Sequence, residues 1–550
     1  MQNESSSILP GACATAALNR RSVDPVEIEL KFQVPSGSRE RLRAALATAT
    51  ARTVHLRAIY FDTADQRLAA AGFALRLRQE GSGWVQTLKG RGDGLMTRLE
   101  HEVQVLARVA QVVQVARAGQ PDTPALDAAR HAGTPAGDAL NKLLADGAAL
   151  EPRYGTDIQR LQRRVRSGGA TIELAFDEGH IAAGKRRLAV CELELELVAG
   201  PPAALLALAE RWVARHGLWL DVRTKAERGH RLALGLTQVP AVKAGLLALT
   251  KASTPDEAFS SMLHSALAQL LPNAAEVATE VASELAPELV PAAAAEAAAG
   301  SGGAAALHQL RVAIRRLRTA LRVAAPWSTD ASAARALEAR WREPFTRLGA
   351  ARDADVIAGW LQPALTAAGA PPMRALAVPH AIASASVVRE PAFSLLVLQT
   401  MQLALAATSA SALAPLPAPV PRALQDAVAA LIKRAWRRVR TDAAGFAAAT
   451  ADERHRARKR LKRLRYTTEF LLPILPKREA KRALRAMRDA LDALGKYNDL
   501  LVAQAALQQR AAQDPHAWFA LGWLAAQHDV YVARAGRRLQ TLTASPRFWR

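Results

Sequence analysis

Charged and apolar side chains alternate in a short segment near the start of the chain. Residues 26–32 read VEIELKF, in which two glutamates and a lysine are separated by Ile28, Leu30 and Phe32. A β-strand repeats every two residues, so the charged side chains share one face and the apolar ones the other. Taken alone, this segment predicts an amphipathic strand whose charged face is in water.

The same alternation recurs in ALRLRQ, WVQTLKG, RLEHEVQV and CELELELV, whose charged or polar faces comprise Arg76 and Arg78; Thr87 and Lys89; Arg98, Glu100 and Glu102; and Glu192, Glu194 and Glu196. Solvated strands usually mix charges with Ser, Thr and Gln, whereas these faces are nearly pure sets of carboxylates or cations. If the strands close into a barrel with charges inward, cations could hold a polyphosphate and carboxylates the divalent metals that neutralise it. The recurrence favours a functional lumen over a solvated sheet.

A different pattern, alanine-rich and helical, takes over from about residue 253. HQLRVAIRRLRTAL begins at His308 and HRARKRLKRLRYTTEF begins at His455. Each is followed by an LG motif, at Leu348 and at Leu494. The separation between the two histidines is almost the same as the separation between the two LG motifs. This spacing indicates one duplicated unit.

Each repeat predicts a helix with a cationic stripe. Side chains at offsets 0, 3, 7 and 10 share one helix face. The two stripes, called the basic stripes below, are His308, Arg311, Arg315 and Arg318, and His455, Arg458, Lys462 and Arg465. A single such stripe is often a solvated face, but two copies with few acidic residues between the cations favour a linear polyanion as partner.

Inorganic polyphosphate fits this partner better than single-stranded nucleic acid does. Single-strand binding usually requires aromatic platforms, and the stripes offer only Tyr466. Nucleic acid is therefore not the expected partner, although phosphate contacts alone would permit non-specific binding of duplex DNA.

Composition narrows the class of protein further. A chain of 550 residues predicts two or more domains, and a net charge of +23 agrees with a polyanionic partner. The two cysteines, Cys13 and Cys191, form no CxxC motif, which excludes a disulfide framework or zinc finger and fits a reducing cytoplasm. The uncharged stretch 391–421 is interrupted by polar residues and prolines, so it predicts a buried helix, and we expect no membrane association.

The strand motifs carry a family resemblance. ExExK at 27–31, YFDT at 60–63, LRLR at 75–78, TLKG at 87–90, RLEHE at 98–102, ELELEL at 192–197 and KAERGH at 225–230 resemble, in order, a CYTH domain. The resemblance implies a triphosphate tunnel metalloenzyme: an eight-stranded antiparallel barrel, open at both ends, that acts on triphosphates with Mg²⁺ or Mn²⁺.

The resemblance also implies roles for individual residues. It assigns phosphate binding to Lys31, Arg76, Arg78, Lys89, Arg98, Arg160 and Lys225, metal binding to Glu27, Glu29, Asp177, Glu192 and Glu194, and catalytic roles to Glu27, Glu29, Lys31, Glu100 and Glu102. The aromatic residue usual after the assigned Arg160 is absent from IQRLQRRVR, so Arg163 and Arg164 stay open as alternatives.

The repeated H-x-x-R helices and LG motifs resemble a CHAD domain, a helical module of two similar bundles associated with inorganic polyphosphate. The expected α+β architecture is a disordered segment at 1–24, a CYTH barrel at 25–235, a linker at 236–252, and an all-α CHAD domain at 253–550 with repeats at about 253–410 and 422–550.

The expected function combines the two resemblances. The CYTH part hydrolyses inorganic triphosphate to pyrophosphate and phosphate, and the CHAD part binds long-chain inorganic polyphosphate, in the cytoplasm and in a form that could associate with polyphosphate granules. Two alternatives stay open: a non-catalytic polyphosphate-binding scaffold, and an enzyme for a nucleoside or thiamine triphosphate, including an adenylate cyclase.

Overall fold

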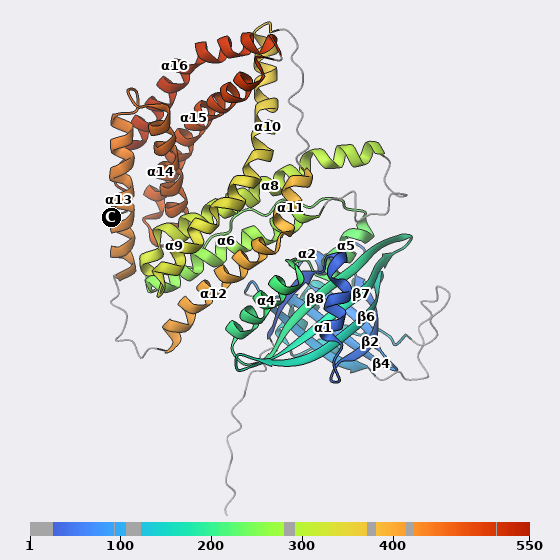
Figure 1. Cartoon of the computed structure of the whole chain (residues 1–550). Helices are drawn as coiled ribbons and strands as arrows, with labels where there is room; N and C mark the ends of the chain where they lie inside the picture. Colours follow the sequence, from blue (N-terminus) through green and yellow to red (C-terminus); the bar gives the residue numbers. More distant parts are fainter. Residues whose placement is uncertain are drawn as a thin grey trace, which may run out of the picture.

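The computed structural model describes residues 26–92, 94–105, 123–279, 292–370, 381–413, 423–512 and 514–549. The expected disordered segment 1–24 lies outside these residues. The described chain forms a β-barrel followed by a helical domain, as the α+β prediction required (Figure 1).

Eight antiparallel strands form the barrel: β1 (Val26–Gln33), β2 (Arg52–Asp62), β3 (Ala74–Glu80), β4 (Gly83–Arg91), β5 (Thr97–Val105), β6 (Glu151–Ser167), β7 (Ala170–Ala183) and β8 (Arg186–Ala199). The order runs β5-β4-β3-β2-β6-β7-β8-β1, and pairing of β1 with β5 closes the sheet. The two-residue β9 (Trp219–Leu220) adds a further pairing to β1. The predicted eight-stranded barrel is confirmed.

The alternation in β1 separates the inside of the barrel from the outside. Leu30 and Phe32 are buried against the helices that cover the outer face, in one core with Leu205 of α4 (Pro202–His216). Glu29 and Lys31 lie on the opposite, inner face and are also buried. The solvated-face interpretation of VEIELKF is therefore wrong, and the lumen interpretation is confirmed.

Short helices accompany the barrel: α1 (Arg39–Leu46), α2 (Arg67–Ala70), α3 (Pro135–Leu143), α4 (Pro202–His216) and α5 (Lys225–Leu234), with 3-10 turns η1 (Ser36–Ser38) and η2 (Ala128–His131). The inner faces of β2, β6, β7 and β8 carry an apolar cluster that includes Leu56, Ile158 and Ile181, and Leu232 of α5 packs into it. Apolar side chains and α5 thus occupy one end of the lumen. The expected opening at both ends is not found among the described residues.

The helical domain contains α6 (Pro255–Ala278), α8 (Ala292–Val323), α9 (Ala331–Arg340), α10 (Arg342–Ala367), α11 (Ala381–Arg389), α12 (Pro391–Leu413), α13 (Ala423–Ala444), α14 (Ala451–Phe470), α15 (Lys477–Arg510) and α16 (His516–Thr543), with 3-10 turns η4 (Ala325–Trp327) and η5 (Leu472–Ile474). Residues 236–254 form neither helix nor strand. The uncharged stretch that begins at residue 391 is the largely buried α12, which lies beside α4 of the barrel (Figure 1). Across the described helices, none combines the length and apolarity needed to cross a membrane.

Replacing Leu232 with Ala tests whether α5 is held by the apolar end of the lumen. Leu232 is 5% exposed, so the truncation should lower the free energy of unfolding by about 2 to 4 kcal/mol, as for other buried leucines. Urea denaturation of the full chain measures this value. Leu236→Ala, at a position that is 46% exposed, is the matched control, and equal losses in both variants would contradict the packing.

Candidate functional site

Three carboxylates converge inside the barrel. Asp177 of β7 pairs in register with Glu192 of β8, and Glu194 follows two residues later on the same face. One carboxylate oxygen from each lies within 4.8 Å of the others, and Asp177 and Glu192 have no exposed surface. A compact set of oxygen donors fits a hard divalent cation such as Mg²⁺ or Mn²⁺.

Asp177 and Glu194 are held in the charged form that metal ligands require. Burial acts to raise the pKa of Asp177, but Arg160 and Lys225 lower it below its usual range. Burial also opposes ionisation of Glu194, yet Lys225, Lys31 and Arg160 hold its pKa well below the ordinary value.

Arg160 and Lys225 reach the acidic cluster directly. The Arg160 guanidinium donates to both oxygens of Asp177 at 2.7 Å and to Glu194 at 2.6 Å. The Lys225 Nζ atom lies 2.6 Å from Asp177, 2.5 Å from Glu192 and 3.0 Å from Glu194.

The three candidate arginines of β6 differ in their positions, and the phosphate-binding role of Arg160 stays a prediction. Arg163 donates to the Thr48 hydroxyl at 3.3 Å, and Arg164 pairs with Glu173 while 65% of its side chain is exposed. Arg160 is the one that lies at the acidic cluster.

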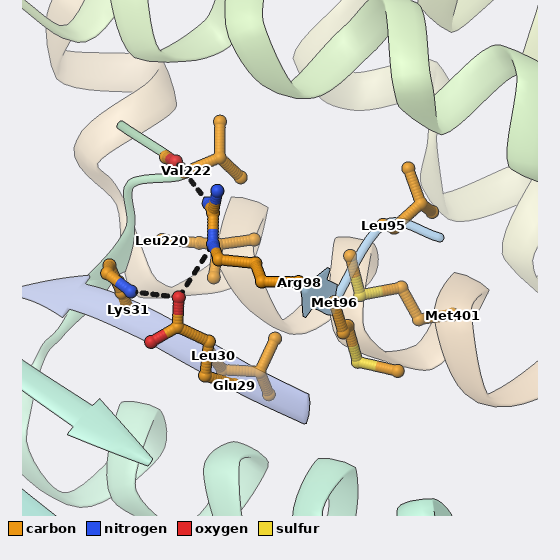
Figure 2. A pocket seen from close by; sticks show the side chains of 9 residues that line it. All are labelled: Glu29, Leu30, Lys31, Leu95, Met96, Arg98, Leu220, Val222 and Met401. Atoms are coloured by element: carbon orange, nitrogen blue, oxygen red, sulfur yellow. Dashed lines mark hydrogen bonds and ion pairs between the residues drawn. The ribbon is translucent and has the colours of Figure 1, made fainter. Parts of the chain in front are cut away.

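A second charged group surrounds Glu29. The Glu29 carboxylate pairs with Lys31, and Arg98 Nε donates to it at 2.7 Å (Figure 2). Lys31 Nζ also lies 3.6 Å from Glu194, which connects this group to the acidic cluster. Burial acts against the Glu29 charge, but Lys31 and Lys89 lower its pKa to about 2.

Glu27 belongs to a third group, with Lys89 and Glu100. The Lys89 Nζ atom lies 2.8 Å from Glu27 and 3.0 Å from Glu100. Burial raises the pKa of Glu27 to about 7, and the charges of Glu29 and Glu100 add to this effect against the attraction of Lys89. Glu27 can therefore exchange a proton near neutral pH. Neither Glu27 nor Glu29 is part of the three-carboxylate cluster.

Arg76 and Arg78 of β3 form the fourth group. Arg76 donates to the Tyr60 hydroxyl at 3.2 Å, and Arg78 donates to Glu102 at 3.3 Å. Their Nε atoms are buried and find no hydrogen-bond partner among the described residues. Because a buried donor without a partner is costly, these two N–H groups suit an anion that enters the lumen.

Two lumen residues were missed by the sequence analysis. Arg228 is 5% exposed and pairs with Glu192, and Tyr60 accepts the hydrogen bond from Arg76. Arg228 follows Lys225 by three residues, which places both on one face of α5. The spacing within KAERGH could have revealed it.

The helices that carry the two basic stripes contact each other at Tyr466, whose ring centre also lies 4.6 Å from the Arg465 guanidinium of the second stripe. Arg315 of α8 donates to the hydroxyl of Tyr466, on α14, at 3.3 Å. All stripe residues are partly or fully buried, so neither stripe is a simple solvated face. The guanidinium groups of Arg311, Arg315 and Arg318 lie 5.2 to 5.6 Å from the centre of the Phe345 ring on α10. This aromatic contact was not predicted, because Phe345 lies outside the two H-x-x-R segments that carry the stripes.

Arg318 and Arg465 have acidic partners, although few acidic residues lie between the cations in the sequence. Arg318 donates to Glu338 of α9 at 2.8 Å, and Arg465 lies 3.6 Å from Glu469. On α14, burial lowers the pKa of His455, and Lys459 adds to this against a hydrogen bond with Asn498. His308 occupies the matching position on α8, and Arg458 and Lys462 complete the α14 stripe.

Comparison with known proteins agrees with this geometry. The CYTH domain model matches residues 26–230, and the CHAD domain model matches residues 286–508. The wider domain boundaries expected from the sequence stay predictions.

Individual relatives match parts of the chain. An inorganic triphosphatase of Haemophilus influenzae is 28% identical over 212 residues, which cover 38% of this chain. The chain spans about half, 54%, of the length of that relative.

Among solved structures, the CHAD domain from the plant Ricinus communis is 25% identical, with a TM-score of 0.41, over 56% of this chain and 98% of that one. A Hippeastrum protein with a dominant triphosphatase activity is 20% identical, with a TM-score of 0.25, over 38% of this chain and 96% of that one. From the matched models, the chain is a CYTH-CHAD protein, in which a CYTH domain precedes a CHAD domain.

Proposed function

We propose that the CYTH domain hydrolyses inorganic triphosphate to pyrophosphate and phosphate with Mg²⁺ or Mn²⁺. The observation that carries the proposal is the buried cluster of Asp177, Glu192 and Glu194, surrounded by lumen cations. The relative named as an inorganic triphosphatase supports it.

Asp177, Glu192 and Glu194 would hold the metal, which when bound polarises a phosphoryl oxygen and neutralises charge. Arg160 and Lys225 now pair with these same carboxylates. In the proposed complex they turn towards phosphate oxygens, where they stabilise the charge that develops on the leaving group.

The remaining lumen groups orient the substrate and accept the proton of the attacking water. Arg76 and Arg78 offer their partnerless Nε atoms to phosphate oxygens, and Lys31, Lys89 and Arg98 add positive charge. Glu27, with a pKa of about 7, accepts the proton of the attacking water. Glu29, Glu100 and Glu102 keep the neighbouring cations in place through their ion pairs.

Leu232 and its apolar neighbours occupy the α5 end, so an organic substituent would have to leave through the other end. A scaffold without turnover is the second candidate, since the same cations could hold a polyphosphate end.

Phosphate release by the full chain separates these candidates. We expect release from tripolyphosphate with Mg²⁺ or Mn²⁺, none with EDTA, and slower release from ATP and thiamine triphosphate. Glu194→Gln should lower kcat by about a hundredfold or more, because it removes a charged ligand from the metal set.

Glu178→Gln is the matched control, because Glu178 lies on β7 but contacts Arg43 outside the lumen. If none of the three substrates shows metal-dependent phosphate release, hydrolysis is refuted and the scaffold candidate remains. Equal losses in both variants would contradict the assigned cluster.

We also propose that the CHAD domain binds long-chain inorganic polyphosphate in the cytoplasm and at polyphosphate granules. The observation behind this proposal is the contact between the stripe-bearing helices α8 and α14 at Arg315 and Tyr466, together with the three arginines of the first stripe that gather around Phe345. A flexible chain of phosphates can follow such a line of donors without base stacking.

Replacing Arg315 and Arg458 with Gln should weaken polyphosphate binding by about tenfold or more and flatten its salt dependence, because fewer counterions are released. Arg478→Gln with Arg482→Gln, on the exposed face of α15, is the matched control. Competition between polyphosphate and duplex DNA at physiological salt measures selectivity. Equal affinity for the two would reduce the site to a general polyanion surface.

Polyphosphate affinity should rise as the pH falls from about 7.5 to about 6, because a bound anion favours protonated histidine. In the free protein, burial and the cations Lys459, Arg458 and Lys462 lower the pKa of His455, against the hydrogen bond with Asn498. Bound phosphate raises this pKa, so binding takes up a proton in that interval. Isothermal titration at several pH values measures the effect, and an undiminished dependence in His455→Gln would exclude His455 as its source.

A further inference from the structure

The segment from Trp219 to Leu234 lies between the lumen and the helical domain. It comprises β9, a short loop and α5. On one side, Lys225 and Arg228 of α5 contact the lumen carboxylates. On the other side, the same segment touches three helices of the CHAD domain.

The contacts with the helical domain occur at both ends of the segment. The Leu220 backbone N–H donates to Ser394 Oγ of α12 at 2.9 Å. At the other end, Arg231 Nη2 lies 2.6 Å from Glu276 of α6. Both side chains of this ion pair are mostly shielded from water, at 22% and 15% exposure, so solvent screens the pair less than a surface pair.

Arg389 of α11 adds a third contact. Its guanidinium lies 5.9 Å from the centre of the Trp219 ring. Its Nε atom also donates to the carbonyl oxygen of Ala278, in the helical domain, at 2.7 Å. Arg389 is thus held by its own domain while it covers the first residue of the segment.

The loop between β9 and α5 is joined to β1 and β5 of the barrel. The Asp221 N–H donates to the Lys31 carbonyl oxygen at 3.0 Å, and its buried carboxylate accepts from Arg223 at 2.7 Å. Arg98, which holds Glu29, also donates to the Val222 carbonyl oxygen at 3.5 Å (Figure 2). Met401 of α12 lines the same pocket as Arg98 and Glu29.

Helix α5 cannot fix the positions of Lys225 and Arg228 in the lumen by its own stability. It has 10 residues, and a helix of this length is marginal in water without tertiary contacts. Its capping box, made by Thr224 and Glu227, stabilises the first turn only. The direction in which Lys225 and Arg228 enter the lumen therefore depends on what α5 packs against.

We infer that the helical domain positions the candidate active site: Glu276, Ser394 and Arg389 hold the segment 219–234, and this segment aligns Lys225 and Arg228 with the lumen carboxylates. Glu276 and Arg231 are positioning residues, since they touch neither metal nor substrate. The inference rests on the proposed function for its kinetic consequence, but the positioning itself can be measured without turnover.

A charge exchange in the full chain tests this inference. Glu276→Arg and Arg231→Glu each place like charges together, and the double exchange restores an opposite pair. Each single variant should speed amide hydrogen exchange in residues 225–234 by about tenfold, because the local opening free energy falls. Each should also lower kcat for tripolyphosphate by about tenfold with a smaller change in KM, because α5 cations act on the transition state.

The double variant should recover at least half of both losses on a logarithmic scale. The control is the same exchange at Arg347 and Glu390, an ion pair within the helical domain at 2.6 Å, which should leave exchange in α5 and kcat unchanged. Unchanged exchange in α5 for both single variants, or losses that the double variant does not recover, would overturn the inference. A wild-type chain without turnover would refute the proposed hydrolysis, while the exchange measurement would still decide the positioning.

Discussion

The constraint on which the barrel depends is the burial of many charges in one lumen. A lone charge removed from water costs several kcal/mol, so each must be paired or neutralised by its neighbours. The lumen meets this requirement by alternating acids and bases between neighbouring strands: Lys89 lies between Glu27 and Glu100, and Arg160 between Asp177 and Glu194. The barrel closes around a network of ion pairs in which acidic and basic side chains neutralise each other. A metal can replace the cations at the carboxylates, and a polyanion can replace the carboxylates at the cations.

This compensation also explains why α5 lies in the lumen. The strands provide Arg160 and Lys31 to the acidic cluster, whereas Glu192 pairs with Lys225 and Arg228 of α5. Withdrawing the helix would leave Glu192, which has no exposed surface, with a buried charge and without these two partners. Leu232 of α5 thus packs into the apolar end of the lumen, while Lys225 and Arg228 of the same helix neutralise the lumen carboxylate of Glu192. The contacts of α5 with the CHAD domain then become part of the electrostatics of the site.

Much of this organisation could be predicted from the sequence, and what could not depends on contacts distant along the chain. The alternation in β1 defined two faces, and its recurrence in β3, β4, β5 and β8 indicated that the charged face points inward. The family resemblance assigned Lys225 to the site, but the entry of α5 into the lumen was not predicted, because a 10-residue amphipathic helix has the same pattern whether it covers a barrel or enters it. Phe345 and Glu338 were missed for a similar reason, since each meets the first basic stripe from another helix.

The lumen and the basic stripes handle charge in opposite ways. In the lumen, carboxylates from neighbouring strands neutralise the cations, so a substrate must displace existing ion pairs. At the stripes, Glu338 and Glu469 pair with Arg318 and Arg465. Arg311 and Arg315 lie beside Phe345, whose ring attracts cations without cancelling their charge. Exchange of partners suits a site that must bind, react and release, because the paired state is restored when products leave. Contacts with an aromatic ring leave positive charge uncancelled at the first stripe, which suits retention of a polymer of phosphates.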